Sequence, residues 1–480
     1  MGDGSLGGLK PYPEMRGSGV PWLGPVPKHW GIRRFKYLLR ERDSRSPDGS
    51  EQLLRVSQYT GVTERRRDDG GDEPDTRAAS LVGYKQVDPN ELVVNIMLAW
   101  NGSLGVSSYA GITSPAYCVY KFGPDLEPWY FHHLLRSPTF RAKIKSVSTG
   151  VVDSRLRLYS DALYRLEAII PPPAEQAAIV RFIDHVDRKI RKYIRAKQKL
   201  IKLLEEQKQA IIHRAVTRGL DPNERLKPSG VDWLGDVPEH WQVVRLKFAT
   251  TAIVDCLHAT PKYSDAGQFP AIRTADVSPG VVRVSSAKRV DGDEFRRWTQ
   301  RLEPTAGDIL YSREGERFGI AACVPNGTRL CISQRMMVFR PSSEHDSTFL
   351  MWALNSQQVY AQACQDVMGA TAPHVNVGTI RNYQLSLPDR DEQVSIVRYI
   401  ESSTAGFETA IAAAVSEIEL LREYRVRLVA DVVTGKVDVR EAGTQFLNET
   451  DESLEFGDEL TNGEMEAAEE HAEATEESDA

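Results

Sequence analysis

The clearest pattern of apolar and polar positions lies in two long stretches that contain almost no Gly or Pro. The first runs from Ala174 to Arg218 and contains neither residue; prolines precede it and Gly219 follows it. Its apolar residues recur at steps of three and four, which is typical of a helix with one buried stripe. The spacing predicts a stripe of Ile183, Val186, Ile190, Tyr193, Leu200, Leu204 and Ile211, interrupted by Lys197 and Gln207.

The second stretch runs from Asp391 to Thr434 and is interrupted only by Gly406. Its predicted stripe is Ile400, Phe407, Ile411, Ala414, Ile418, Leu421, Leu428 and Val432. At about 1.5 Å per residue, each helix would be roughly 60 Å long. Neither stripe can stay exposed, so we expect the two helices to pack together as a coiled coil. The alternative is that they are core helices of larger domains.

The segment before each long helix mixes short apolar runs with a short helical stretch. The runs ELVVNIML, GDILYS and RMMVFR have the composition of strands, whereas WYFHHLLRS and FLMWALNSQ have that of helices. Each segment therefore predicts a mixed α/β domain of about 150 residues.

The two segments also share a sequence. SGVPWLGPVPKHWGIRRFK begins at Ser18 and SGVDWLGDVPEHWQVVRLK at Ser229, with 12 of 19 positions identical. PPPAEQAAIVRFI from Pro171 and PDRDEQVSIVRYI from Pro388 form a second pair, and its two copies lie nearly as far apart in the sequence as those of the first pair. Solenoid repeats are only about 20–50 residues long, far shorter than the separation between these copies. The pattern therefore indicates an internal duplication of a whole domain, and a function that needs two of something.

Charge and cysteine content narrow the class of protein. The net charge is −7, but residues 441–480 contain fifteen Asp or Glu and no Lys or Arg, so residues 1–440 carry −7 + 15 = +8. A mildly basic body is compatible with nucleic acid, and the acidic tail is expected to be disordered. Five cysteines without a CxxC motif favour a reducing cytosol over disulfides or zinc. We find no phosphate-binding loop, HExxH or GxSxG motif, which favours a binding module over an enzyme.

The motifs SGVxWLGxVPxHW and PxxxEQxxIVxxI, each present twice and in this order, resemble the specificity subunit of type I restriction–modification systems. The resemblance implies two target-recognition domains in a pseudo-two-fold repeat, each reading one half of a bipartite, asymmetric double-stranded DNA site. It implies that the long helices are antiparallel, set the spacing and dock two methyltransferase subunits, which restriction subunits can join. S-adenosylmethionine, ATP and Mg²⁺ would then be bound by those partners, and this cytoplasmic chain would be non-catalytic.

The expected fold class is therefore α+β, with two mixed α/β domains separated by two long helices. The predicted divisions are an N-terminal extension 1–17, recognition domain 18–172, helix 173–219, recognition domain 220–388, helix 389–440 and acidic tail 441–480. Two other functions remain open: a coiled-coil scaffold that binds proteins without DNA specificity, and a methyltransferase with degenerate motifs.

The repeated motifs supply one group of candidate residues, a frame between domain and helix. The group comprises Trp22, His29, Trp30, Glu175, Gln176, Trp233, His240, Trp241, Glu392 and Gln393. The aromatic members suit packing or partner docking, with direct DNA contact as the alternative. The Glu–Gln pairs stand in a first helical turn, where capping explains a carboxylate as well as subunit contact does.

A second group consists of polar side chains near glycine-containing loops, where bases could be read. The candidates are Asn101, Ser103, Tyr117, Arg155, Arg157, Arg313, Arg317, Gln334, Arg335, His374 and Asn376. For each of them, a phosphate contact or a solvated charge is the alternative. No residue suggests a metal site.

Overall fold

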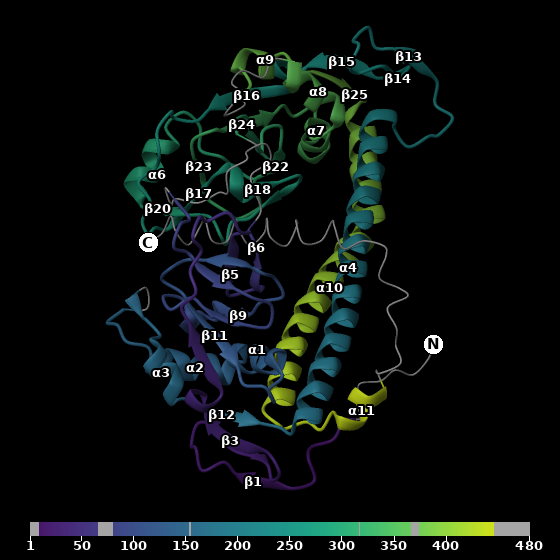
Figure 1. The fold of residues 1–480 in the computed structure, drawn as a ribbon. Helices are drawn as coiled ribbons and strands as arrows, with labels where there is room; N and C mark the ends of the chain where they lie inside the picture. Colours follow the sequence, from purple (N-terminus) through teal and green to yellow (C-terminus); the bar gives the residue numbers. More distant parts are fainter. Residues whose placement is uncertain (1–8, 66–79, 153–154, 316, 366–373, 446–480) are drawn as a thin grey trace. The chain divides into compact units, whose positions relative to one another are not determined.

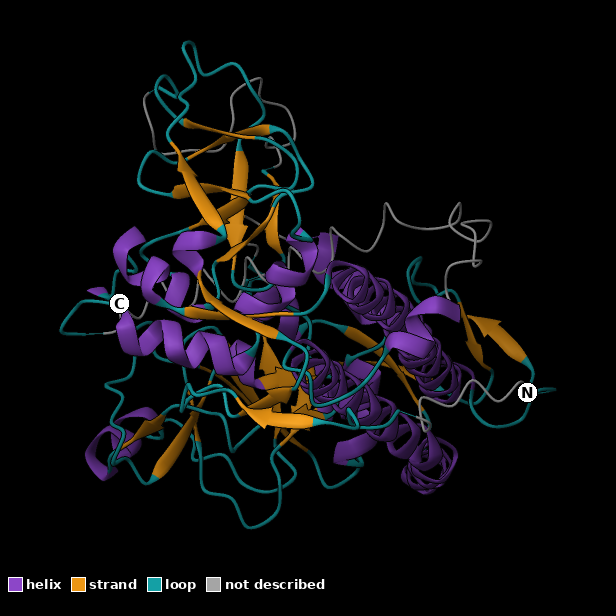
Figure 2. Ribbon diagram, turned by 60° about the horizontal axis from the view of Figure 1, so that its bottom comes forward, coloured by secondary structure: helices purple, strands orange, loops and turns teal. Residues whose placement is uncertain are grey.

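The fold is described from a computed structural model that covers residues 9–65, 80–152, 155–315, 317–365 and 374–445 (Figure 1). The chain forms two compact units, the first made of Met1–Ala196 with Glu417–Ala480 and the second of Lys197–Ser416. Two long helices, α4 (Pro173–Arg218) and α10 (Arg390–Val433), each contribute one part to either unit. Both units combine strands with short helices (Figure 2), so the predicted α+β class is confirmed.

The first unit contains twelve short strands in the described residues. They are β1 (Met15–Gly17), β2 (Pro25–Pro27), β3 (Gly31–Arg34), β4 (Leu39–Arg42), β5 (Leu54–Ser57), β6 (Gly61–Glu64), β7 (Lys85–Val87), β8 (Leu92–Val94), β9 (Leu104–Val106), β10 (Gly111–Thr113), β11 (Cys118–Phe122) and β12 (Glu167–Ile170). Its short helices are η2 (Phe35–Tyr37), η3 (Ala99–Asn101), α1 (Pro128–Arg136), α2 (Pro138–Val147), α3 (Ser160–Arg165) and α11 (Arg440–Gln445).

The second unit has a similar set of elements. Its strands are β13 (Leu226–Pro228), β14 (Asp236–Pro238), β15 (Gln242–Arg245), β16 (Thr250–Asp255), β17 (Phe269–Ile272), β18 (Val277–Ser278), β19 (Val281–Val282), β20 (Arg289–Val290), β21 (Ile309–Ser312), β22 (Ala321–Cys323), β23 (Cys331–Ile332), β24 (Met336–Pro341) and β25 (Gln384–Leu387). Its short helices are α5 (Leu246–Ala249), η5 (Thr274–Asp276), α6 (Gly292–Trp298), α7 (Ser347–Leu354), α8 (Gln357–Gln365) and α9 (Val377–Arg381).

One antiparallel four-stranded sheet lies in each unit, with the order β4-β11-β8-β9 in the first and β16-β24-β21-β22 in the second. A helix follows each sheet, α1 with Glu127 as its N-cap and α7 with Asp346. A strand pair, β3 with β12 or β15 with β25, then leads into the long helix. The strands and short helices expected from the apolar runs are therefore confirmed.

The turn before β8, and the equivalent turn before β21, show how different residues satisfy the same backbone. Asn90 has φ 68° in the first unit, and Gly307 has φ 84° in the second. This left-handed conformation is open to Gly and tolerated by Asn, whereas most other residues avoid it. Each turn is followed by a buried acidic side chain, Glu91 or Asp308, that accepts a hydrogen bond from the backbone amide three positions earlier.

The long helices begin and end within one residue of the two predicted stretches, 174–218 and 391–434, and α10 is continuous through Gly406. α10 ends at Val433, before the end of the predicted division 389–440. Within the first unit, the start of α4 packs against the end of α10 through Ile183, Val186, Ile190, Leu428 and Val432. Within the second unit, the end of α4 and the start of α10 share a core that includes Ile212, Val216, Ile396 and Ile400. The two helices are thus antiparallel, and the expected packing of one against the other is confirmed (Figure 1).

The predicted stripe of α10 matches the structure, but that of α4 is wrong in its middle. Tyr193 and Leu200 are exposed, whereas their neighbours Ile194 and Ile201 are half-buried. The buried stripe therefore continues from Ile190 to Ile194, a step of four where a step of three to Tyr193 was predicted. A straight helix has 3.6 residues per turn, so a strict 3.5-residue repeat drifts around its surface by about 20° per heptad, and an extra step of four compensates.

The start of the predicted acidic tail also differs from the structure. Residues 441–445 belong to α11, where Ala442 packs against the first core and the Arg181 guanidinium donates to the Gly443 carbonyl at 3.3 Å. The rest of the predicted tail lies outside the described residues. Among the helices that the structure describes, none is long and apolar enough to cross a membrane.

Candidate functional site

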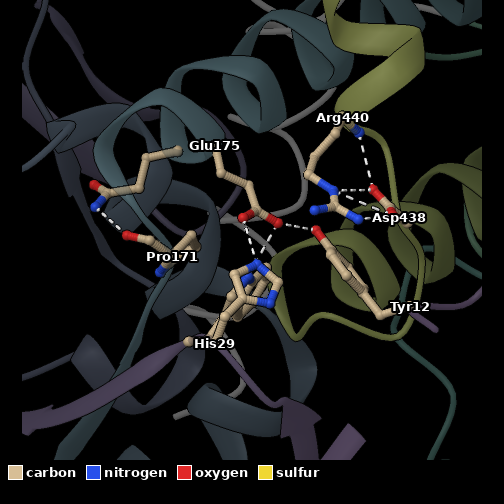
Figure 3. Close-up of polar contacts among 8 residues, drawn as sticks. Tyr12, His29, Pro171, Glu175, Asp438 and Arg440 are labelled. Atoms are coloured by element: carbon tan, nitrogen blue, oxygen red, sulfur yellow. Dashed lines mark hydrogen bonds and ion pairs between the residues drawn. The ribbon is translucent and has the colours of Figure 1, made fainter. Parts of the chain in front are cut away.

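The carboxylate of Glu175, in the first turn of α4, is the centre of a polar cluster in the first unit. His29 Nε2 lies 2.8 Å from Glu175 Oε2, and Trp30 Nε1 donates to Oε1 at 3.0 Å. The Tyr12 hydroxyl donates to the same Oε1. Figure 3 shows Tyr12 and His29 converging on Glu175. Glu175 is buried, so these donors replace the water that its charge would otherwise need.

A segment near the end of α10 covers this cluster. Asp438 N donates to Lys10 O at 2.8 Å, and the Arg440 guanidinium lies 5.2 Å from the centre of the Tyr12 ring. Burial favours a higher pKa for Asp438, but hydrogen bonds from Arg440 outweigh it and hold the pKa below its usual value. Burial and the adjacent Glu175 raise the pKa of Tyr12, which therefore stays protonated and remains a donor.

Glu392, in the first turn of α10, has the corresponding contacts in the second unit. His240 Nε2 lies 2.7 Å from Glu392 Oε2, and Trp241 Nε1 donates to Oε1 at 3.1 Å. The hydrogen bond to Glu392 raises the pKa of His240, and Glu224, 3.6 Å from the other ring nitrogen, adds to the shift. Glu175 and Glu392 thus hold the strand–helix corner of each unit by binding the histidine–tryptophan pair of the repeated motif.

The glutamines that follow complete the corner in the same way in both units. Gln176 donates to Pro171 O at 2.8 Å and accepts from Glu127 N at 2.9 Å. Gln393 donates to Pro388 O at 2.9 Å and accepts from Asp346 N at 2.9 Å. Each glutamine therefore joins the start of a long helix to the N-cap residue of α1 or α7.

The remaining frame candidates, Trp22 and Trp233, are both half-buried. The Trp22 ring meets Phe140 edge-on with centroids 4.9 Å apart, and Lys143 Nζ lies 5.7 Å from the Trp22 ring centre. The buried Nε1 atom of Trp233 has no hydrogen-bond partner among the described residues. Whether any frame residue docks a partner stays a prediction.

Three of the predicted base-reading residues of the second unit meet around Glu314, beyond the end of β21. Arg313 is buried, with Nη2 2.6 Å from Glu314 Oε1 and Nε 3.2 Å from Asp255 Oδ1. Arg335 has half of its side chain exposed, with Nε 3.9 Å from Glu314 Oε2. His374 pairs with Glu314 through a backbone bridge. The corner thus presents an exposed guanidinium that is neutralised only in part.

The other candidates of this unit lie at separate points. The Arg317 guanidinium donates to Val277 O at 2.8 Å. Gln334 is exposed and accepts from Thr260 Oγ1 at 3.4 Å. Asn376 is the N-cap of α9, and its side chain accepts from Gly378 N at 2.8 Å.

The first-unit candidates gather around the end of β8, at Asn95. Asn95 N donates to Ser103 O at 3.1 Å, and Asn95 Nδ2 donates to the Tyr117 hydroxyl at 3.0 Å. Ser103 is buried and donates both its amide and its hydroxyl to Asn101 Oδ1, at 3.1 and 2.9 Å.

Arg155 and Arg157 belong to a segment that lies beside the same strand end. Leu158 N donates to Ile96 O at 2.9 Å, and the second unit has the equivalent bond from Val375 N to Arg313 O at 3.1 Å. Arg155 is exposed and Arg157 is half-buried. The first-unit candidates and the group around Glu314 in the second unit therefore lie at equivalent strand ends, although their role in binding DNA stays a prediction.

Several residues of these sites were not expected from the sequence. Tyr12 and Arg440 lie outside the repeated motifs, and nothing in the pattern connects them with Glu175. The acidic partners Asp255 and Glu314 could not be paired with Arg313 before the strands were placed. Among the residues that the structure describes, no three His, Cys, Asp or Glu side chains are grouped to hold a metal ion.

Comparisons with known proteins agree with this architecture. Residues 238–417 match the family model for the type I restriction modification DNA specificity domain. The specificity subunit of the type I restriction enzyme MjaVIII from Methanocaldococcus jannaschii is 21% identical over 374 residues, covering 74% of this chain and 83% of the relative.

Two solved structures are also similar. One comes from a study of complex assembly and conformational transition in the type I restriction–modification system, with a TM-score of 0.59, 15% identity, and coverage of 85% of this chain and 98% of the other. The HsdS subunit from Thermoanaerobacter tengcongensis has a TM-score of 0.44 and 17% identity over 86% of this chain and 98% of its own. Only the first score is high enough to indicate a shared fold.

Residues 238–417 thus have the sequence pattern of a type I DNA specificity domain. The predicted resemblance to the specificity subunits of type I restriction–modification systems is confirmed by the family model over residues 238–417 and by the similarity of this chain to the MjaVIII specificity subunit.

Proposed function

We propose that each unit reads one half of a bipartite DNA site. The observation that carries this proposal is the repeated corner: Glu175 with His29 and Trp30, and Glu392 with His240 and Trp241, join each recognition unit to a long helix in the same way. Two equivalent attachments suit an approximate two-fold arrangement, and a two-fold protein pairs with two half-sites at a fixed separation.

The half-sites differ from each other, so the recognised site is asymmetric. At equivalent strand ends the first unit has the Asn101–Ser103 turn and Tyr117, whereas the second has Arg313 and Arg335. Arginine favours guanine and asparagine favours adenine in the major groove. Because these side chains differ, we expect the two units to recognise different base sequences.

We also propose that α4 and α10 set the distance between half-sites and dock two methyltransferase subunits. Large apolar side chains on these helices remain exposed, which supports a partner surface. They include Tyr193, Leu200, Leu203, Tyr399, Leu420 and Tyr424. The methyltransferases would supply adenine methylation from S-adenosylmethionine, and two restriction subunits with ATP and Mg²⁺ would complete the cytoplasmic complex. In this proposal the chain itself is non-catalytic.

The test is a map of methylated adenines in strains with and without the gene for this chain. The proposal predicts one split, asymmetric motif that disappears on deletion and returns on complementation. A coiled-coil scaffold without DNA specificity predicts no change of the map. DNA binding by the purified complex should also fall steeply with salt, because basic side chains displace counterions from phosphates.

A further inference from the structure

The Arg136 guanidinium, at the end of α1, is held by backbone carbonyl groups of two separate segments. In the first segment, Nη1 donates to Ser57 O at 3.2 Å, and Nη2 donates to Gln58 O at 2.8 Å and to Tyr59 O at 2.7 Å. In the second segment, Nη1 donates to Gly102 O at 2.9 Å and to Leu104 O at 2.8 Å. A guanidinium has five N–H donors in a fixed plane, so these contacts fix both segments relative to each other.

The first segment is the tip of the β5–β6 hairpin, and the second is the turn that carries Asn101. Ser57 Oγ accepts from Tyr59 N at 3.1 Å, which shapes the hairpin tip. Gly61 closes the tip with φ 83°, a conformation that other residues rarely adopt. The neighbouring His132 Nδ1 accepts from Val106 N at 3.1 Å, and burial lowers the pKa of His132, which keeps this nitrogen an acceptor.

The side chains displayed by this clamped edge suit nucleic acid. Tyr59 is 48% exposed, and Gln58 and Asn101 beside it are half-buried. The amide of Gln58 matches the N6 and N7 atoms of adenine in the major groove, and a tyrosine ring can stack or hydrogen-bond at a groove edge. Asn101 Oδ1 accepts from Ser103, so Asn101 offers its Nδ2 group as a donor. Base recognition requires such groups to be held rigidly, which the Arg136 contacts provide.

Among its described residues, the second unit has no equivalent of this edge. Asn355, which directly follows α7, takes the place of Arg136 and bonds both N and O of Ala321, at 3.0 and 2.9 Å. Ala321 begins β22 as Leu104 begins β9, so the contact to the strand is common to both units. The second-unit hairpin β18–β19 turns through Pro279 and Gly280, whose side chains offer neither an amide nor an aromatic ring.

We propose that Gln58 and Tyr59, fixed beside Asn101 by Arg136, form a base-reading edge of the first unit, with Arg136 as a positioning residue. This inference rests on the proposed function and adds the residues through which the first half-site is read. It predicts that the first half-site contains an adenine that this edge contacts. The hairpin of the second unit makes no such contact.

The test is methylated-adenine mapping in strains that express Gln58→Ala, Tyr59→Ala or Arg136→Gln together with the natural partner subunits. Gln58→Ala and Tyr59→Ala alter side chains at a hairpin tip, so folding should be preserved. Each should reduce discrimination at one or more positions of one half-site, on the order of 10-fold or more, and leave the other half-site unchanged. Arg136→Gln should relax the same half-site, whereas Arg136→Lys, which keeps the charge without the planar fork, should give a smaller effect.

Tyr37→Ala is the matched control, because Tyr37 is also an exposed tyrosine of the first unit, at 70%. It should leave both half-sites unchanged, and an equal effect of Tyr37→Ala would overturn the inference. If Gln58→Ala and Tyr59→Ala preserve the wild-type motif, the inference fails although the proposed function stands. A map that is unchanged by deletion of the gene sinks the proposed function itself. Loss of methyltransferase co-purification with Tyr59→Ala, at unaltered sequence preference, would show that the edge binds protein instead.

Discussion

Arg425 on α10 forms a two-pronged ion pair with Asp187 on α4, with Nε and Nη2 lying 2.8 and 2.7 Å from the two carboxylate oxygens. The Asp187 side chain is only 9% exposed, whereas that of Arg425 is 43% exposed. Both residues belong to the first unit, where they fix the start of α4 against the end of α10. A buried carboxylate that loses its cation is strongly destabilising, and partial exposure of the cation moderates the effect.

Replacing Arg425 with Ala should therefore lower the free energy of unfolding by about 1–3 kcal/mol. Arg427→Ala is the matched control, since Arg427 and its partner Glu423 are 76% and 63% exposed. Its effect should stay below about 0.5 kcal/mol. Urea unfolding of the full chain measures both values, and equally small effects would show that the Asp187 pair does not hold the helices.

The contact between His240 and Glu392 should make the second unit sensitive to pH. Because its pKa is raised in the folded chain, His240 contributes stability that is complete below its unfolded pKa of about 6.5. That contribution is lost as the pH rises through the folded pKa. The melting temperature should thus fall as the pH rises above about 6.5, and Glu392→Gln should flatten the profile. A profile identical in wild type and Glu392→Gln would contradict this linkage.

Arg335 has φ 70°, a left-handed conformation that is unfavourable for most residues with a Cβ atom, arginine and alanine included. Arg335→Gly should therefore be more stable than Arg335→Ala by about 1 kcal/mol. If Arg335 reads a base, both variants should relax one half-site by about 1–3 kcal/mol, and Arg335→Lys should fail to rescue it. A uniform loss of affinity on all sequences, rescued by Lys, would instead assign Arg335 to phosphate.

Removing the residues after Gln445 should tighten binding to non-specific DNA. This part of the chain carries fourteen Asp or Glu and no Lys or Arg, so it competes with phosphate for basic surface. The effect should be largest at low salt and fade as the salt concentration rises. A titration of truncated and complete complexes at several salt concentrations measures it. Unchanged or weaker non-specific binding of the truncated complex would count against the idea.

The sequence predicted the long helices closely because their signals are local. Prolines before the first stretch and Gly219 after it stop the helix at either end, and the apolar steps of three and four define its buried face. The stripe of α4 was wrong at Tyr193 and Leu200, because periodicity alone does not show where the extra step of four falls. That choice depends on the partner helix.

The candidate sites were predictable only where the motif is repeated. Two copies of the histidine–tryptophan pair and of the Glu–Gln pair indicated a shared frame, and the structure joins them at Glu175 and Glu392. The contacts of Tyr12 with Glu175 and of Arg136 with the hairpin join segments distant in sequence. No spacing rule indicates such contacts, since they depend on how strands and loops are placed.

In the proposed function, α4 and α10 separate two independent readers. The boundary between the units crosses α4 after Ala196 and α10 after Ser416, so inserting four residues near Gln198 and after Ser416 lengthens both helices between the units. Four residues add about 6 Å and slightly more than one turn, which keeps the buried faces close to register. One base pair adds about 3.4 Å and about 35° of rotation, so some activity should be lost through misalignment.

Mapping methylated adenines in a strain that carries this double insertion is the most direct test. If the helices set the distance, both half-site sequences should remain and the gap between them should grow by one or two base pairs. Methylation at the original spacing, with full activity, would show that the helices do not set the distance. A change in either half-site sequence would show that the two units do not read independently.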